Sequence, residues 1–130
     1  MAIFDVKQDC LHPTLMPSSP LGVLGHEGGF SPDGMTYYVA SLYAHTLAAV
    51  DLTNPRVPTI LWFTYDYQPH GVSLSEDGNT LYMADNGNKG LTILHVSQVH
   101  NRLCKPTVPP TTHPTWRPRR PPRPPTPPPS

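Results

Sequence analysis

The stretch of sequence that decides the fold occurs twice, as HEGGFSPDGMTYYVA at residues 26–40 and as HGVSLSEDGNTLYMA at residues 70–84. The second copy follows the first at a shift of 44 residues, and the two align without a gap. Over residues 26–54 and 70–98 eight pairs are identical: His26/His70, Ser31/Ser75, Asp33/Asp77, Gly34/Gly78, Thr36/Thr80, Tyr38/Tyr82, Ala40/Ala84 and Leu47/Leu91. A period near 44 residues fits one four-stranded blade of a β-propeller.

Each copy begins with a turn and continues as a strand. Ser31–Gly34 combines a proline that sets φ, an aspartate that bonds nearby backbone and a glycine that accepts a positive φ, so it predicts a hairpin turn. Ser75–Gly78 repeats this turn without the proline. The runs behind the turns, Thr36–Ala40 and Thr80–Ala84, are β-rich and too short for helices. We therefore expect residues 20–100 to be almost wholly β.

Further strands surround this repeat. Apolar runs at residues 47–52 and 91–96 predict third strands packed on both faces, and Pro58–Phe63 predicts an outer fourth strand that begins with its proline. The opening residues resemble the third strand again, and residues 12–16 parallel residues 57–61. The predicted fold is all-β, and residues 1–104 are predicted to form an incomplete β-propeller. One full four-stranded blade at about 20–63 is flanked by partial blades at about 1–19 and 64–100.

Three segments carry a resemblance to a known family: Ala2–Val6, Leu47–Leu52 and Leu91–Val96. They look like the LVIVD repeat of bacterial β-propeller proteins, and the blade starts at His26 and Pro69 are similar to those of its YVTN-type relatives. The resemblance covers about residues 1–100. It departs from the pattern at His95, where the aspartate is missing, and at the end, where proline-rich sequence replaces the fourth strand. It implies a propeller fold and, for many members, a place outside the cytoplasm, but a fold does not fix a function.

The composition divides the chain into two parts of opposite charge. Residues 1–104 hold four basic and nine acidic groups, whereas residues 105–130 hold five basic groups, no acidic group and 12 of the 19 prolines. Proline lacks the backbone donor of a sheet, so 105–130 is predicted to be a disordered, basic, polyproline-like tail. Its arginine-bearing proline patterns formally match ligands of SH3-type grooves, and its scattered charges give no specific nucleic-acid binding.

Targeting and redox signals are sparse. No apolar run of 18 residues predicts a membrane span, and no secretory signal is visible at the N-terminus. Cys10 and Cys104 are isolated thiols without C-x-x-C spacing, and we expect them to be inert rather than paired in a disulfide.

The candidate site is a pair of histidines, His26 and His70, which occupy the same position in successive repeats. Equivalent positions on the first strands of propeller blades circle the central channel, and imidazole is a suitable ligand for copper or zinc. Glu27 is a further candidate ligand or orienting partner. The alternative, which we favour, is that each histidine bonds across the blade interface and holds its neighbours in register. No cofactor is required by the sequence.

Two functions remain in view. The first is a non-enzymatic scaffold or binding module built from propeller repeats. The second is a remnant of a propeller metalloenzyme, an oxidoreductase whose channel is lined by histidines. In either case the predicted partners are missing blades or further copies of the chain, because repeat units bury their faces only against neighbours.

Overall fold

The structure is a computed structural model that describes residues 1–16 and 21–100. These residues form an all-β fold, as predicted, and their one helix is the single turn α1 (Ser97–His100). The predicted tail at 105–130, its SH3-type patterns and Cys104 lie outside the described residues. Cys10 is exposed. No helix of the described part is long and apolar enough to cross a membrane.

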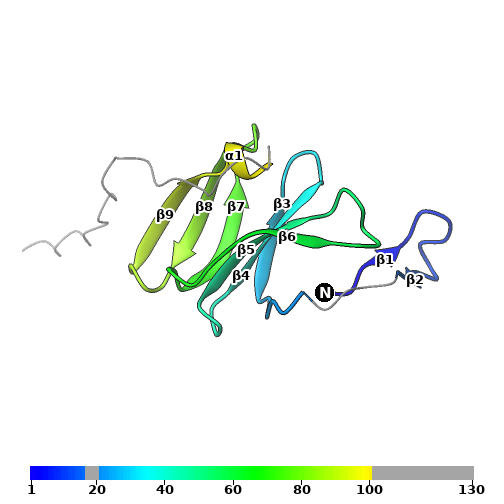
Figure 1. The fold of residues 1–130 in the computed structure, drawn as a ribbon, viewed down its shortest axis with the longest axis horizontal. Helices are drawn as coiled ribbons and strands as arrows, with labels where there is room; N and C mark the ends of the chain where they lie inside the picture. Colours follow the sequence, from blue (N-terminus) through cyan, green and yellow to red (C-terminus); the bar gives the residue numbers. More distant parts are fainter. Residues whose placement is uncertain (17–20, 101–130) are drawn as a thin grey trace, which may run out of the picture.

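The strands form three antiparallel sheets, and in each sheet neighbouring strands follow one another in the chain. The first sheet is a hairpin of two short strands. The second has four strands and the third has three, and Figure 1 shows these two side by side, with the hairpin at the opposite end of the molecule. The strands are β1 (Phe4–Asp5), β2 (Thr14–Leu15), β3 (Glu27–Phe30), β4 (Thr36–Ser41), β5 (Thr46–Asp51), β6 (Thr59–Thr64), β7 (Pro69–Leu74), β8 (Thr80–Asp85) and β9 (Gly90–His95).

Both predicted hairpin turns are present and have the same geometry. The amide of Gly34 donates to the carbonyl of Ser31 at 2.8 Å, and that of Gly78 donates to the carbonyl of Ser75 at 2.9 Å. Both glycines adopt φ = +72°, a conformation that favours glycine because it has no Cβ. In each turn the serine hydroxyl donates to the aspartate two residues later. The turn chemistry therefore repeats with the sequence.

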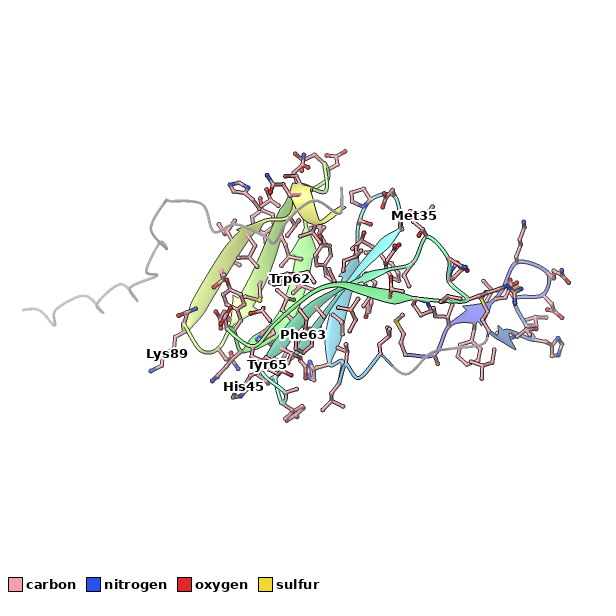
Figure 2. The ribbon with its side chains drawn as sticks, viewed as in Figure 1. Met35, His45, Trp62, Phe63, Tyr65 and Lys89 are labelled. Carbon is pink, nitrogen blue, oxygen red and sulfur yellow. The ribbon has the colours of Figure 1, made fainter. Side chains whose placement is uncertain are left out.

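The turns at the other end of the strands also repeat, although their residues differ. His45, between β4 and β5, has φ = +54°, and Lys89, 44 residues later between β8 and β9, has φ = +52°. Figure 2 shows both side chains at the lower ends of their sheets. The two units thus share a backbone conformation at a position where the sequence repeat is not visible.

The main core lies between the four-stranded and the three-stranded sheet. We call it the inter-sheet core, and it consists of Tyr38, Ala40, Leu47, Ala49, Leu81, Met83, Leu94, Val96 and Val99. Strands β3 and β4 contact β7 across this boundary. Alternate residues of β4 and β5 face the other way, where Val39, Ala48 and Val50 form the far-face cluster. Leu21 and Val23 pack over part of that cluster, so both faces of the four-stranded sheet contain buried apolar residues.

The three-stranded sheet differs because only one of its faces is buried. Tyr38 and Tyr82 are both predicted to pack between blades, and Tyr38 is fully buried. Tyr82 is 39% exposed, because no described residue covers its face of the sheet, so its packing between blades stays a prediction.

The outer edges of the two sheets also differ. β6 is the outer strand of its sheet, as predicted, and the ladder that joins it to β5 shifts register between Ala49 and Val50. Pro58 precedes β6, where it withholds no donor from the ladder. In the three-stranded sheet β9 is the outer strand, and its ladder with β8 runs without a shift from Thr80↔His95 to Asp85↔Gly90.

The N-terminal hairpin repeats the pairing of β5 with β6. Asp5 pairs with Thr14 as Asp51 pairs with Thr59. Its apolar residues are largely exposed, with Phe4 at 53% and Leu15 at 58%, and neither belongs to a core cluster.

Candidate functional site

The two repeated histidines lie side by side at the boundary between the sheets. His26 immediately precedes β3, and its amide donates to the carbonyl of Ala40 at 2.8 Å, which fixes its backbone to β4. His70 is the second residue of β7. Because β3 and β7 are neighbours, the two imidazole rings come within 4.9 Å of each other between centroids, at an angle of 63°.

Glu27 joins this pair from the first position of β3. Its Oε2 lies 3.4 Å from Nδ1 of His70, and the two side chains are about half exposed, at 53% and 51%. This separation is long for a hydrogen bond, and exposed ion pairs contribute little to stability. Glu27 is nevertheless the side chain that connects one sheet to the histidine of the other.

The backbone of β7 makes room for the Glu27 carboxylate. A Cβ at Gly71 would lie 2.5 Å from Oε2 of Glu27, so a side chain at this position would displace the carboxylate. The ladder between β7 and β8 is also irregular between Pro69 and Val72, which takes His70 and Gly71 out of regular pairing. Irregularities of this kind re-aim side chains and often lie beside functional sites.

His26, Glu27 and His70 could together offer three ligands to a metal ion. Their candidate ligand atoms all lie within 4.8 Å of one another, and all three residues are exposed. Ligands bound to one zinc ion at about 2.0–2.1 Å stand about 3.3 Å apart in a tetrahedron, so the side chains would have to close in on the ion. Two imidazoles and a carboxylate suit zinc or copper, and a three-residue set leaves a coordination position open.

The surroundings of the histidines are less organised than those of an established metal site. A metal-bound histidine usually donates its other ring nitrogen to a fixed partner. The ring of His26 instead has edge contacts with His70 and, at 5.9 Å, with Tyr43, which is 76% exposed. The arrangement therefore fits a contact that keeps two sheets in register at least as well as it fits a prepared ligand set.

A hollow of about 260 Å³ opens next to His26 and Glu27, over the far face of the four-stranded sheet. Its apolar lining comes from Met1, Leu21, Val23, Tyr37, Val39 and Val50. One member of the predicted histidine pair, His26, thus lies at the border of an open apolar hollow. The sequence analysis did not predict this hollow.

A buried carboxylate that the sequence analysis also missed lies at the end of β8. Asp85 is 2% exposed and accepts hydrogen bonds from the amides of Gln68 and Gly87 and from the side chains of Asn88 and Thr92, at 2.5–3.1 Å. Burial raises the pKa of Asp85, but these hydrogen bonds outweigh it and hold the pKa below its ordinary value. The network ties the segment before β7 to the β8–β9 turn. Its signal in the sequence is weak, because the equivalent residue of the first unit is Ser41.

No family model matches the chain, and no curated protein is significantly similar to it. Several solved structures resemble its fold, among them these two. One is a functionally unknown protein from Desulfotomaculum acetoxidans, with a TM-score of 0.56 and 22% identity over 73% of this chain. The other is a protein from Lactobacillus plantarum, with a TM-score of 0.57 and 22% identity over 74% of this chain.

The likeness to these structures concerns the fold alone. This chain spans 30% of the length of the first protein and 31% of the second, so each of them continues well beyond the matched part. The class that the fold defines is an all-β chain of consecutive antiparallel units. The chain is similar to parts of two larger proteins, one of them described as functionally unknown.

Proposed function

We propose that the chain is a β-propeller segment of the LVIVD type, and that it acts as a non-enzymatic scaffold or binding module. Its full blade would be the unit at about 20–63, and the units at about 1–19 and 64–100 would be partial blades. The observation that carries this proposal is the packing of two equivalent units face to face, with β3 beside β7 and one core between them.

Three features support a propeller rather than a sandwich of unrelated sheets. Each unit is a meander whose strands follow chain order, as in a blade. The same face of the repeated unit meets the next unit, since Tyr38 and Leu47 point toward β8 and β9. The first strands of the two units are neighbours, as strands around a central channel are.

Replacement of Tyr38 by alanine tests the shared core. This change removes a fully buried aromatic side chain, so we expect a loss of about 3–5 kcal/mol in the free energy of unfolding. Amide hydrogen exchange should show protection falling together in β4–β5 and in β8–β9. Tyr43→Ala, at a 76% exposed tyrosine, is the matched control. Loss of protection in the four-stranded sheet alone would contradict a propeller-like arrangement.

The second candidate function, a remnant of a propeller metalloenzyme, is favoured by the meeting of His26, Glu27 and His70. Elemental analysis of freshly purified protein separates it from the scaffold. Stoichiometric copper or zinc that disappears in both His26→Ala and His70→Ala, with the fold retained, would favour the enzyme. His12→Ala is the control, because His12 is exposed and paired with Asp9 away from this site. Protein without bound metal, which takes up none when copper or zinc is added, favours the scaffold.

A further inference from the structure

The exposed face of the three-stranded sheet carries an apolar patch beside the polar pair of Thr80 and His95. Tyr82 pairs with Ile93, and Ala84 pairs with Leu91, so these four residues share one face of β8 and β9. Tyr82 is 39% exposed and Leu91 is 48% exposed, whereas Leu81 and Met83 on the opposite face are fully buried in the inter-sheet core. We call these four residues, of which Ile93 is half-buried, the open face.

The open face repeats a face that is buried elsewhere in the same chain. Its four residues lie 44 positions after Tyr38, Ala40, Leu47 and Ala49, which form the same cross-strand pairs on β4 and β5. All four of those residues are fully buried against the three-stranded sheet. Three of the four positions carry identical residues, and the fourth changes from Ala49 to the larger Ile93. The open face therefore has the composition of an interface between units.

The chain also carries the complementary surface. The face that receives Tyr38 and Leu47 includes Met83 and Leu94, and their equivalents 44 positions earlier are Val39 and Val50. Val39 and Val50, which are 7% and 1% exposed, form the floor of the far face of the four-stranded sheet and line the hollow of about 260 Å³.

The border of this hollow follows the repeat as well. Val23, which packs over the far-face cluster, is the equivalent of Tyr67, which packs against the inter-sheet core. Val23 thus forms part of the receiving surface rather than a lid that must be removed.

We propose that the open face of one copy docks on the far face of the four-stranded sheet of a second copy, head to tail. This inference rests on the proposed function, and it names the partner as the chain itself. The contact is heterologous, so each copy keeps one unused face, and growth continues until a ring closes. The β1–β2 hairpin has to move aside, which sacrifices little burial because neither core cluster includes its strands.

Sedimentation measurements of the full chain test this docking. Between about 1 μM and about 1 mM, the weight-average mass of the wild-type chain should rise above the 14.3 kDa of the monomer. Leu91→Glu places a charge on the open face, and Val23→Glu places one beside the hollow. Each variant alone should stay monomeric. Val57→Glu is the control, because Val57 is 58% exposed in the loop before β6 and should associate like the wild type.

A mixture of the two variants gives the sharpest outcome. Leu91→Glu keeps an intact receiving surface and Val23→Glu keeps an intact open face, so an equimolar mixture should form a dimer of twice the monomer mass and nothing larger. If open faces paired with each other, Val23→Glu alone would still dimerise. If residues 101–130 covered the open face, the wild-type chain would remain a monomer. Either result overturns the proposal.

Two further measurements distinguish a failure of the docking proposal from a failure of the proposed function. Circular dichroism of each variant establishes that it is folded, and Tyr82→Lys replaces Leu91→Glu if that variant is not. Hydrogen exchange at low protein concentration reports the packing of the two sheets within one chain. In one outcome the wild-type chain stays monomeric while both sheets lose protection together in Tyr38→Ala. That result would contradict the docking but would agree with a propeller-like segment. Independent loss of protection sinks the proposed function itself.

Discussion

The four-stranded and the three-stranded sheet contain the same repeat, yet the first has a buried apolar cluster on both faces and the second on one. Tyr38 and Leu47 have no exposed surface, whereas their counterparts Tyr82 and Leu91 are 39% and 48% exposed. The difference does not come from the residues, which are identical. It comes from the neighbour that each sheet has, because repeat units bury their faces only by stacking. Identical side chains in the two sheets should therefore contribute differently to the free energy of unfolding.

The largest expected effect separates the two repeated leucines. Leu47→Ala should lower the free energy of unfolding by about 2–5 kcal/mol, because it leaves a cavity in the inter-sheet core. Leu91→Ala should cost under about 1 kcal/mol, since half of that side chain already lies in water. Urea denaturation at low protein concentration measures both. Equal losses would mean that the open face is covered, and the comparison of the sheets would fail.

The second largest loss of stability should come from the buried carboxylate of the second unit, Asp85. The carboxylate of Asp85 accepts four hydrogen bonds, and Asp85→Asn replaces one of its two acceptor oxygens with an NH2 group that cannot accept, whereas the equivalent Ser41 accepts one bond from the amide of Ala44. We expect Asp85→Asn to destabilise the protein by about 1–3 kcal/mol and Ser41→Ala by about 1 kcal/mol. Thermal unfolding followed by circular dichroism measures the two losses.

The cost of Asp85→Asn should also depend on pH. The pKa of Asp85 is lowered in the folded protein, so its contribution is complete above the ordinary value of 3.8 and is lost as the pH falls through the folded pKa. The stability difference between Asp85→Asn and the wild type should therefore be constant near neutral pH and shrink below about pH 4. A difference that stays the same into strong acid would show that the charge of Asp85 contributes nothing.

The turn serines offer a smaller, matched comparison. Ser31 is 4% exposed, and its hydroxyl accepts from the amide of Thr36 at 2.9 Å. Ser75 accepts from Thr80 at 3.0 Å in the same way but is only half-buried. Ser31→Ala should cost about 1–2 kcal/mol and Ser75→Ala about half as much, because water can replace the lost bond at the second turn. A larger loss at Ser75 in chemical denaturation would reverse this ranking.

The smallest effect belongs to the contact between Glu27 and His70. Both side chains are about half exposed and their charged atoms are 3.4 Å apart, so Glu27→Gln should change stability by less than about 0.5 kcal/mol. Glu76→Gln, at an exposed residue of the second turn, is the control. A loss above 1 kcal/mol at Glu27 would mean that this pair couples the sheets more strongly than its exposure suggests.

The strands could be predicted from the sequence because local chemistry decides them. The turns at Ser31 and Ser75 and the runs behind them predicted β4 and β8, and the strands end within one residue of the expected positions. Periodicity places alternate residues on opposite faces, but it does not say whether a face has a neighbour. That is why the 39% exposure of Tyr82 could not be predicted from its place in the repeat.

The candidate site could be predicted only in part. The shift of 44 residues indicated that His26 and His70 are equivalent, and the structure brings their rings together. The approach of Glu27 depends on the irregular ladder of β7 and on the space at Gly71, and neither follows from residue spacing. The role of Asp85 was not visible either, because its partners come from three separate segments and its counterpart is a serine.

The outer edge of β9 gives the molecule a capacity for strand capture. In the four-stranded sheet β6 pairs along the outer side of β5, whereas β9 pairs only with β8 among the described residues. The ladder of β9 with β8 is regular, so an added strand would meet an evenly spaced strand backbone. A detached peptide with the sequence of Thr59–Thr64 would find there a place equivalent to its own. The chain could thus serve as a receptor for a short reporter strand that is supplied as a separate peptide and added to this edge.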